Sequence, residues 1–483
     1  MLLSDPSLIK NTLLLNGVWQ AGSSQFAVYN PATGEEIIWV HNASVKDTQL
    51  AIEYAVLAQK QWQQSLAAER AFLLKNWHQL VLQHQHDLAL ILATEQGKPL
   101  SEAKAEILYA ASFIEWFAEE AKRLYGDVIP TTAANRRLMT IKQAVGVVAA
   151  ITPWNFPAAM ITRKLAPAFA AGCTVILKPS ELTPLTAMAL AELAQRAGFA
   201  PGVLQVLPTK EASAVGELLC QSPDVKKLTF TGSTRVGKLL MRQCADTVKR
   251  LSLELGGNAP VLIFADADLP KAVAGVMAAK FRNAGQTCVC INRIYVERAV
   301  YQEFNQLLLK AMQQLVQGSA LEPGVTLGPL INTEAVTKVS ALVQQAINQG
   351  ATLMWAGQKP VAGSNFYPPT LLCDVTQDMA LMQQEIFGPV AAVMPFDSEQ
   401  EAISLANQSA AGLAAYVYSN DISRLWRLAE ALQVGMVGIN ETAISTEVIP
   451  FGGVKESGLG REGSRYGIDE YLEIKHLCWG GLV

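Results

Sequence analysis

Histidine is scarce in this chain, with five among 483 residues, at positions 41, 78, 84, 86 and 476. A zinc site, or a nucleophile activated by imidazole, normally needs histidine beside its other groups. His84 and His86 stand two apart in a region that reads as helical, so their side chains point to different faces. The sequence therefore predicts no metal site. It disfavours a histidine-dependent cysteine hydrolase but leaves that class open.

An excess of positive charge is also missing, because 38 basic residues stand against 42 acidic ones, for a net charge of −4. Without a basic run, the chain has no electrostatic footprint for nucleic acids or anionic membranes. Residues 144–162 form an uncharged stretch long enough to raise the question of a membrane span, but Pro153, Asn155 and Pro157 interrupt it. We expect neither nucleic acid nor membrane as a partner, and a buried strand followed by a loop here.

The seven cysteines are odd in number and have no regular spacing, which is not the pattern of a disulfide framework. The N-terminal residues lack the basic stretch and sustained apolar core of a signal peptide. Both features favour a reducing compartment, and we expect a cytoplasmic protein.

The alternation of apolar and helical segments predicts an α/β fold. A chain of 483 residues, half of them hydrophobic, can build two or three packed domains. Strands are expected at 146–151, 174–177, 203–207, 227–230 and 252–255, with helical segments between them. This order is typical of a parallel, doubly wound sheet, which binds ligands at the carboxyl ends of its strands. Apolar runs at 413–418 and 434–439 predict a second α/β unit.

The stretch FRNAGQTCVCINR, residues 281–293, holds the candidate nucleophile, Cys288. A free cysteine is more often a small buried hydrophobe. Here a turn at 285–287 can bring backbone N–H groups near the sulfur, and we expect Arg282 and Arg293 to favour the thiolate. The sequence thus predicts a reactive thiol in need of a partner from elsewhere in the chain.

Two of the predicted strands deliver candidate partners. After the first strand, TPWNFP (152–157) presents Asn155 between two prolines, where a rigid side-chain amide could stabilise an oxyanion. An ordinary turn is the alternative. The fifth strand sets Glu254 between two leucines, and apolar neighbours raise the proton affinity of such a carboxylate. Glu254 could therefore activate water against a thioester on Cys288.

Two further strand ends are typical of a nucleotide site. Lys178 and Glu181, in KPSE, leave the second strand together and suit ribose hydroxyls, although solvated loop charges explain them as well. The fourth strand runs into a glycine turn that nearly matches a P-loop, but Leu239 replaces the Ser or Thr that would hold magnesium. An NTPase is therefore disfavoured, and a looser pyrophosphate contact through Gly232 and Ser233 remains.

These motifs, in this order, resemble the NAD(P)-dependent aldehyde dehydrogenase superfamily over nearly the whole chain. The resemblance rests on TPWNFP, KPSE, FTGST, ELGGN, GQTC, EIFGPV (385–390) and PFGGVKESGLGREG (450–463). ITPWNFPAAMITRK, FRNAGQTCVCINR and YLEIK look like the succinate-semialdehyde dehydrogenases within it.

The resemblance implies three structural parts. An NAD(P)-binding domain would comprise residues 1–122 and 142–254, and an α/β catalytic domain residues 255–466. Residues 123–141 and 467–483 would form a small β element that joins subunits into a homodimer or homotetramer.

The resemblance also implies a covalent mechanism. Cys288 would attack an aldehyde, and the Asn155 amide with the backbone N–H of Cys288 would hold the oxyanion. Hydride would pass to the cofactor, and Glu254 would activate the water that releases the acid. Members that transfer the acyl group to coenzyme A lack this glutamate, so hydrolysis is expected. The retention of all three groups argues against a non-catalytic, dinucleotide-binding structural protein.

Cofactor and substrate residues are implied in the same way. The carboxylate of Glu181 would favour NAD by repelling a 2′-phosphate, with NADP still possible. A substrate carboxylate would meet three residues, although the acid at Glu441 brings negative charge near them. Glutarate semialdehyde and hydroxy or sugar aldehydes remain alternatives. Some relatives pair a cysteine at position 290 with the nucleophile, but we expect two free thiols. The implied cofactor residues are Ile151, Trp154, Lys178, Glu181, Gly232, Ser233, Leu255, Glu385 and Phe387, and the implied substrate residues are Arg163, Arg282 and Ser445.

Overall fold

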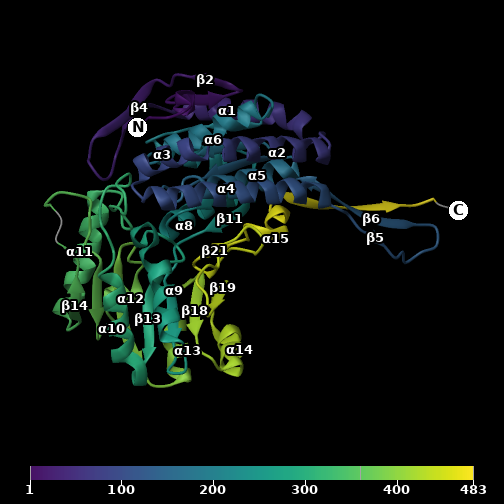
Figure 1. Ribbon diagram of the computed structural model, residues 1–483. Coiled ribbons are helices and arrows are strands. Elements are labelled where there is room, and N and C mark those ends of the chain that lie inside the picture. Colours follow the sequence, from purple (N-terminus) through teal and green to yellow (C-terminus); the bar gives the residue numbers. More distant parts are fainter. Residues whose placement is uncertain (1, 359–360, 482–483) are drawn as a thin grey trace.

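The computed structural model describes residues 2–358 and 361–481 (Figure 1). An eight-stranded sheet carries the first half of the chain, in the order β2-β1-β9-β8-β7-β10-β11-β21. Its five central strands are parallel, which confirms the predicted doubly wound arrangement. The strands are β1 (Leu13–Leu15), β2 (Val18–Gln20), β7 (Val147–Ile151), β8 (Val175–Lys178), β9 (Leu204–Val206), β10 (Val225–Thr231), β11 (Arg250–Glu254) and β21 (Gly458–Leu459).

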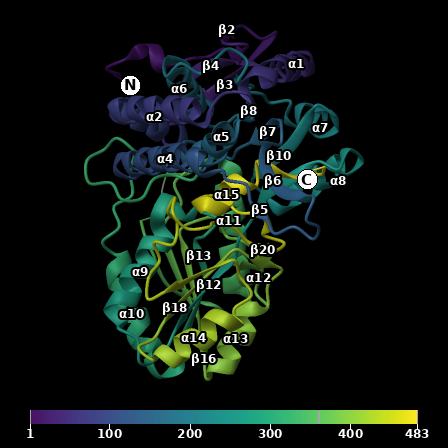
Figure 2. The ribbon, with the colours of Figure 1, turned by 90° about the vertical axis from the view of Figure 1, so that its right-hand side faces the viewer.

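Helices cover both faces of this sheet (Figures 1 and 2). The longest of these helices, α4, buries one apolar face with Ile107, Ile114 and Phe117 and ends at Glu120. The hairpin of β3 (Ser24–Tyr29) and β4 (Glu36–Asn42) lies beside this layer. The helices are α1 (Val45–Trp62), α2 (Ala67–Gln83), α3 (Gln85–Gln96), α4 (Leu100–Glu120), α5 (Ala159–Ala171), α6 (Pro184–Arg196), α7 (Ala212–Gln221) and α8 (Thr234–Cys244).

The second half of the chain builds a seven-stranded sheet in the order β14-β15-β16-β13-β12-β18-β19. All neighbouring strands are parallel except β14 and β15, which confirms a second α/β unit. The strands are β12 (Ala259–Ile263), β13 (Ile291–Glu297), β14 (Thr352–Ala356), β15 (Thr370–Cys373), β16 (Val390–Phe396), β18 (Ala414–Tyr418) and β19 (Met436–Ile439). The helices are α9 (Leu269–Phe281), α10 (Tyr301–Met312), α11 (Thr333–Asn348), α12 (Ala380–Gln383), α13 (Glu399–Asn407) and α14 (Ile422–Ala431).

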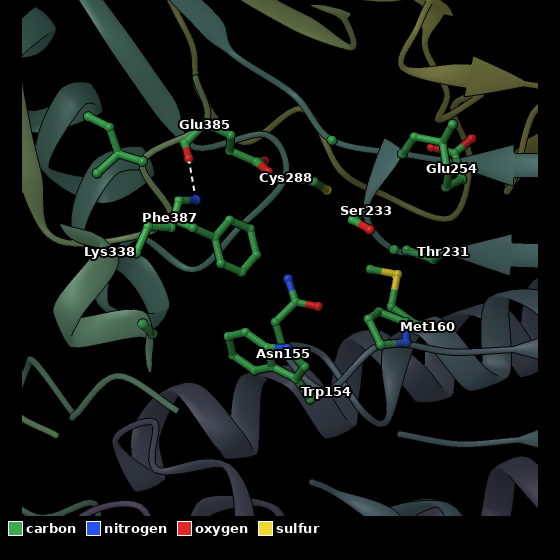
Figure 3. A pocket seen from close by; sticks show the side chains of 16 residues that line it. Trp154, Asn155, Met160, Thr231, Ser233, Glu254, Cys288, Lys338, Glu385 and Phe387 are labelled. Atoms are coloured by element: carbon green, nitrogen blue, oxygen red, sulfur yellow. Dashed lines mark hydrogen bonds between the residues drawn. The ribbon is translucent and has the colours of Figure 1, made fainter. Parts of the chain in front are cut away.

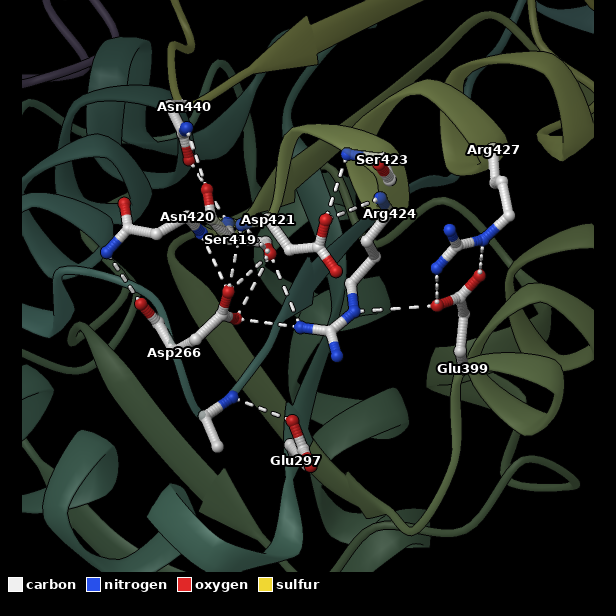
Figure 4. A network of polar contacts seen from close by, with 11 residues as sticks. Asp266, Glu297, Glu399, Ser419, Asn420, Asp421, Ser423, Arg424, Arg427 and Asn440 are labelled. Atoms are coloured by element: carbon white, nitrogen blue, oxygen red, sulfur yellow. Dashed lines mark hydrogen bonds and ion pairs between the residues drawn. The ribbon is translucent and has the colours of Figure 1, made fainter.

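A polar network closes the end of this second sheet that lies beyond the carboxyl ends of its strands (Figure 4). Asp266, which follows β12, accepts hydrogen bonds from the Ser419 hydroxyl and from the backbone N–H groups of Asn420 and Asp421. Arg424 of α14 adds an ion pair at 2.8 Å. These hydrogen bonds and the ion pair join the loops at this end of the sheet, so we assign the network a structural role.

A three-stranded antiparallel arm projects from the body (Figure 1). It consists of β5 (Val128–Ile129), β6 (Arg137–Ala144) and β22 (Leu472–Trp479), paired in the order β22-β6-β5. Just before β22, α15 (Ser464–Asp469) packs on α4 and α5, and β21 pairs with β11. The two-stranded sheet of β17 (Ala411–Gly412) and β20 (Val454–Lys455) completes the fold. The C-terminal segment therefore returns to the first sheet.

Within the described residues, no helix combines the length and apolar character needed to cross a membrane. The same part of the chain contains no cluster of His, Cys, Asp and Glu able to hold a metal ion.

Candidate active site

Three strands of the first sheet end together at one cavity of about 290 Å³ (Figure 3). Pairing sets Ile151 of β7 beside Phe230 of β10, and Thr231 of β10 beside Glu254 of β11. The residues that follow therefore emerge side by side. Trp154 and Asn155 come from the first loop, Gly232 and Ser233 from the second, and Leu255 from the third. This is the carboxyl edge at which the sequence predicts chemistry.

The second unit faces the same cavity with the opposite ends of its strands. Cys288 precedes β13, and Glu385 and Phe387 precede β16, so these residues lie at the amino ends of their strands. Figure 3 shows Cys288 in the same cavity as Asn155 and Glu254. The structure thus brings the three predicted catalytic residues together from widely separated parts of the sequence.

A tight backbone turn holds the Cys288 loop. Asn283, Ala284 and Gly285 adopt φ values of 51°, 53° and 76° in succession. A Cβ at Gly285 would lie 2.2 Å from the carbonyl oxygen of Gly388, so only glycine fits there. No hydrogen bond among the described residues uses the backbone N–H of Cys288, which leaves that group free to bind an oxyanion.

Of the two arginines expected to favour the thiolate, only Arg282 lowers the pKa of Cys288, and its effect is outweighed. Burial raises the pKa of Cys288 to about 12, and Glu385 adds to the increase, while Arg163 and Arg282 only partly oppose it. Arg293 donates instead to the carbonyls of Asn258, Leu405 and Ala406. Loss of solvation outweighs the positive charges, so the surroundings of Cys288 favour its thiol form.

The Asn155 side chain is buried and held in place. Its Nδ2 donates to the carbonyl oxygen of Gln286 at 2.9 Å, two residues before Cys288. A primary amide carries two N–H groups, so one is used for this contact and one remains. The geometry suits a fixed oxyanion donor beside the sulfur.

Glu254 is 4% exposed, and neither carboxylate oxygen has a hydrogen-bond partner in the described part of the chain. Burial and the nearby Glu462 raise the pKa of Glu254 well above its ordinary value, against the pull of Arg163 and Lys164. A Cβ at Gly452 would lie 3.0 Å from Glu254 Oε1, so glycine leaves room beside that buried oxygen. Such a carboxylate suits a general base.

Glu385, Phe387 and Trp154, three of the implied cofactor residues, also line this first cavity. Burial raises the pKa of Glu385 to about 7, and the backbone N–H of Gly257 donates to its carboxylate at 3.2 Å. Phe387, at φ 58°, meets Trp154 edge to face with ring centroids 5.6 Å apart. The two rings come from different units, so the cavity is bounded jointly by both.

The helix that follows β10 offers an anion site. Ser233 caps α8 by accepting from the N–H of Val236 at 3.4 Å, and the helix N-terminus favours negative charge. A Cβ at Gly237 would lie 2.4 Å from Leu255 Cδ2, so glycine lets α8 lie against that side chain. Gly232 and Ser233 therefore lie at a helix N-terminus that favours an anion.

Three predicted cofactor residues lie away from the wall of this cavity. Ile151 is buried in the core and pairs with Lys178 at the end of β8. Lys178 Nζ lies 3.7 Å from Glu181 Oε2. Ile151 ends β7, whose following loop lines the cavity, whereas Lys178 and Glu181 lie at the end of β8, the neighbouring strand.

A second cavity of about 200 Å³ lies on the other side of the Cys288 loop. Thr287 and Val289, the neighbours of Cys288, line it together with Arg282, Ser445 and Thr442. Arg282 stacks on Phe156, with its guanidinium carbon 4.9 Å from the ring centroid. Two of the three predicted substrate residues therefore meet here.

Arg163, the third predicted substrate residue, lies elsewhere. It is 1% exposed, its Nη2 lies 2.9 Å from Glu462 Oε2, and its guanidinium stacks on Phe451. It lines neither cavity. Glu441 does not line the second cavity either; its carboxylate accepts from the backbone N–H groups of Ala443 and Thr442, and these bonds lower its pKa.

Sequence reasoning missed several lining residues. Met160, Thr231 and Lys338 line the first cavity, and Thr287 and Tyr416 line the second. Apolar and strand patterns made most of them indistinguishable from core or loop residues.

Cys290 is buried with its sulfur 3.6 Å from the carbonyl oxygen of Lys280, and both it and Cys288 are free thiols.

Comparison with known proteins agrees with this geometry. Residues 19–477 match the model of the aldehyde dehydrogenase family. The chain is 53% identical to the succinate-semialdehyde dehydrogenase [NADP(+)] GabD of Escherichia coli (strain K12), over 99% of this chain and 100% of that one. It is 52% identical to 3-sulfolactaldehyde dehydrogenase of Pseudomonas putida, over 99% of both. The crystal structure of succinate-semialdehyde dehydrogenase from Burkholderia pseudomallei superposes with a TM-score of 0.98 at 53% identity, covering 99% of this chain and 100% of that one.

Proposed function

Since the chain belongs to the aldehyde dehydrogenase family, we propose that it oxidises succinate semialdehyde to succinate with NAD(P)+. The observation that carries this proposal is the meeting of Cys288, Asn155 and Glu254 at one cavity, with Arg282 and Ser445 in a second cavity across the same loop. The first arrangement suits oxidation of an aldehyde through a thioester, and the second suits a substrate carboxylate.

In the proposed reaction, the Cys288 sulfur attacks the aldehyde carbon as its proton leaves for solvent or a nearby base. The Asn155 amide and the backbone N–H of Cys288 hold the resulting oxyanion. A nicotinamide held by Trp154, Glu385 and Phe387 would supply the acceptor for the hydride of this carbon. As the C–O bond closes to a carbonyl, a thioester remains on Cys288. Glu254 then takes a proton from water, which attacks the thioester and releases the acid and the thiol.

The cofactor would lie along the edge of the first sheet. Trp154, Phe387 and Glu385 would hold the nicotinamide and its ribose, and Gly232 with Ser233 the pyrophosphate. Ile151 and Leu255 would pack against it, while Lys178 and Glu181 would meet the adenosine ribose. We propose a preference for NAD over NADP, because the Glu181 carboxylate would repel a 2′-phosphate, although Lys178 at 3.7 Å weakens that repulsion.

The substrate carboxylate would bind in the second cavity. A buried carboxylate needs a cation and further donors, and Arg282 with Ser445 supplies both. Arg163 would not contact the substrate carboxylate directly, since its guanidinium lines neither cavity and is already paired with Glu462.

A sulfonated aldehyde is the second candidate substrate. The Pseudomonas putida relative named for 3-sulfolactaldehyde is as similar to this chain as the succinate-semialdehyde dehydrogenases are. Arginine also binds a sulfonate, and Thr442 and Ser445 could meet a substrate hydroxyl. Initial rates with succinate semialdehyde, glutarate semialdehyde, 3-sulfolactaldehyde and butyraldehyde, each with NAD and with NADP, distinguish these substrates and the cofactor preference.

The direct test of the chemistry is Cys288→Ala. We expect this variant to lose dehydrogenase turnover while still binding cofactor, since only the nucleophile is removed. Undiminished turnover would refute the covalent mechanism. Ester hydrolysis without cofactor, but no dehydrogenase activity, in the unmodified protein would favour a cysteine hydrolase.

The arm supports association with a second copy of the chain. Its exposed apolar residues include Val128 at 80%, Ile474 at 70% and Trp479 at 62% exposure. Such residues on a projecting sheet favour burial against a partner. We propose a homodimer or homotetramer joined through 123–141 and 467–483, beside a cofactor domain of 1–122 and 142–254 and a catalytic domain of 255–466. Light scattering of the intact protein and of Trp479→Glu tests this arrangement.

We place the protein in the cytoplasm. Its seven cysteines are all free in the structure, which suits a reducing compartment.

A further inference from the structure

A buried ion pair lies behind the loop that carries Asn155. Lys98 follows α3, and Glu106 belongs to α4. Their side chains are each 1% exposed, with Lys98 Nζ 2.6 Å from Glu106 Oε2. Such pairs seldom add net stability, because desolvation offsets the attraction between the charges. A role in positioning therefore fits this pair better than a role in stability.

The pair holds the Asn155 loop on both sides of Phe156. Lys98 Nζ donates to the backbone carbonyl of Asn155 at 2.8 Å and lies 3.8 Å from the ring centroid of Phe156. Glu106 Oε1 accepts from the backbone N–H groups of Ala158 at 2.9 Å and Ala159 at 3.3 Å. The two charges thus determine where the loop runs before α5 begins.

The same carbonyl is tied to the nucleophile loop. Asn283 Nδ2 donates to the Asn155 carbonyl at 2.9 Å and to the Gln286 carbonyl at 3.2 Å. The Gln286 carbonyl also receives the side-chain amide of Asn155. Asn155 is therefore held at its backbone by Lys98 and Asn283, and at its side chain by the residue two before Cys288.

We propose that Lys98 is a positioning residue for the reaction, which sets the Asn155 amide against the Cys288 sulfur by holding the Asn155 carbonyl. This inference rests on the proposed function, in which Asn155 binds the oxyanion. Lys98 acts through Asn155, since its ammonium is enclosed by Glu106, Asn155 and Phe156 and lines neither cavity.

The expected loss of kcat follows from how accurately an oxyanion donor must be placed. Moving a reacting or stabilising group by about 1 Å can lower a rate by about 100-fold. We expect Lys98→Met to lower kcat by about 10- to 100-fold while leaving KM for aldehyde and cofactor nearly unchanged. The methionine keeps the length of the side chain and removes its donor.

The test is a double-mutant cycle of Lys98→Met with Asn155→Ala, with melting temperature and cofactor binding measured for every variant. If Lys98 acts through Asn155, adding Lys98→Met to Asn155→Ala should cost less than about threefold in kcat. A double variant whose loss equals the product of the two single losses would overturn the inference. So would wild-type kcat in Lys98→Met beside a large loss in Asn155→Ala. Full turnover in Asn155→Ala would instead refute the oxyanion role in the proposed function.

Lys227→Met is the matched control. Lys227 is fully buried and lies 3.6 Å from Glu470, but it contacts the Ser252 hydroxyl and the Tyr471 ring instead of the Asn155 loop. Lys227→Met removes one partner of an ion pair with Glu470, so we expect a lower melting temperature. We expect kcat to be retained. Equal kcat losses in the two lysine variants would mean that the effect of Lys98 is general destabilisation.

If Lys98→Met does not fold, Asn283→Gly carries the same test. Glycine adopts the φ of 51° found at Asn283 without strain and removes the second donor to the Asn155 carbonyl. Its kcat loss should also nearly vanish in the Asn155→Ala background, and a multiplicative loss would count against the inference.

Discussion

Removal of Arg282 tests the proposed carboxylate site most directly. Arg282 lines the second cavity with Ser445, and a substrate carboxylate there would receive charge-assisted hydrogen bonds from its guanidinium. Hydrogen bonds to charged groups contribute about 1.5–3 kcal/mol, which corresponds to about a 10- to 150-fold change in binding. We therefore expect Arg282→Ala to raise KM for succinate semialdehyde by that factor.

Part of the activity that Arg282→Ala loses should be independent of the charge on the substrate. Arg282 stacks on Phe156, next to Asn155, so its removal disturbs the oxyanion loop for every aldehyde. Butyraldehyde has the same number of carbons without the carboxylate and reports this shared loss. The informative quantity is the ratio of kcat/KM for the two aldehydes, measured by the absorbance of the reduced cofactor and compared between wild type and variant.

Arg163→Ala provides the contrast. Arg163 is paired with Glu462 and lines neither cavity, and its charge also opposes the high pKa of Glu254. Its loss should reduce kcat for both aldehydes to a similar extent. Equal losses for the two aldehydes in Arg282→Ala would refute the carboxylate assignment and leave an aldehyde dehydrogenase of another substrate.

Three further predictions concern residues of the first cavity and of the proposed ribose site. Glu254→Gln should give a burst of reduced cofactor followed by a slow steady state, because acylation precedes the step that needs the base; stopped-flow traces in which both phases fall equally would contradict this role. Glu181→Ser should shift the ratio of kcat/KM toward NADP by removing a carboxylate from the ribose site, and an unchanged ratio would remove the basis for the NAD preference. Glu385 has a pKa near 7 in the fold against an ordinary 4.5, so its ionisation costs stability increasingly as pH rises between these values and fully above them. Glu385→Gln should therefore raise the melting temperature of the cofactor-free protein more at about pH 8 than at about pH 5, and an equal change at both would contradict the raised pKa.

The first sheet and its edge were predictable because their signals are local. Apolar runs of strand length, separated by helical segments, imply parallel strands whose carboxyl ends share one edge. Asn155, Gly232 and Glu254 each follow or end such a strand, so their convergence follows from the fold class alone. The order of the motifs was likewise enough to indicate the family, which the match over residues 19–477 confirms.

Long-range contacts were beyond the reach of the sequence, and they decide the chemistry of the site. Arg282 and Arg293 near Cys288 in sequence suggested a thiolate, yet burial from both units dominates and raises its pKa. Arg163 looked like a substrate ligand until the fold placed Glu462 against it. Lys98 carried no signal at all, because its partners on α4 and on the Asn155 loop meet only after folding. Spacing along the chain determines periodic structure, whereas solvation and charge pairing depend on which distant residues surround a group, and only the tertiary structure supplies them.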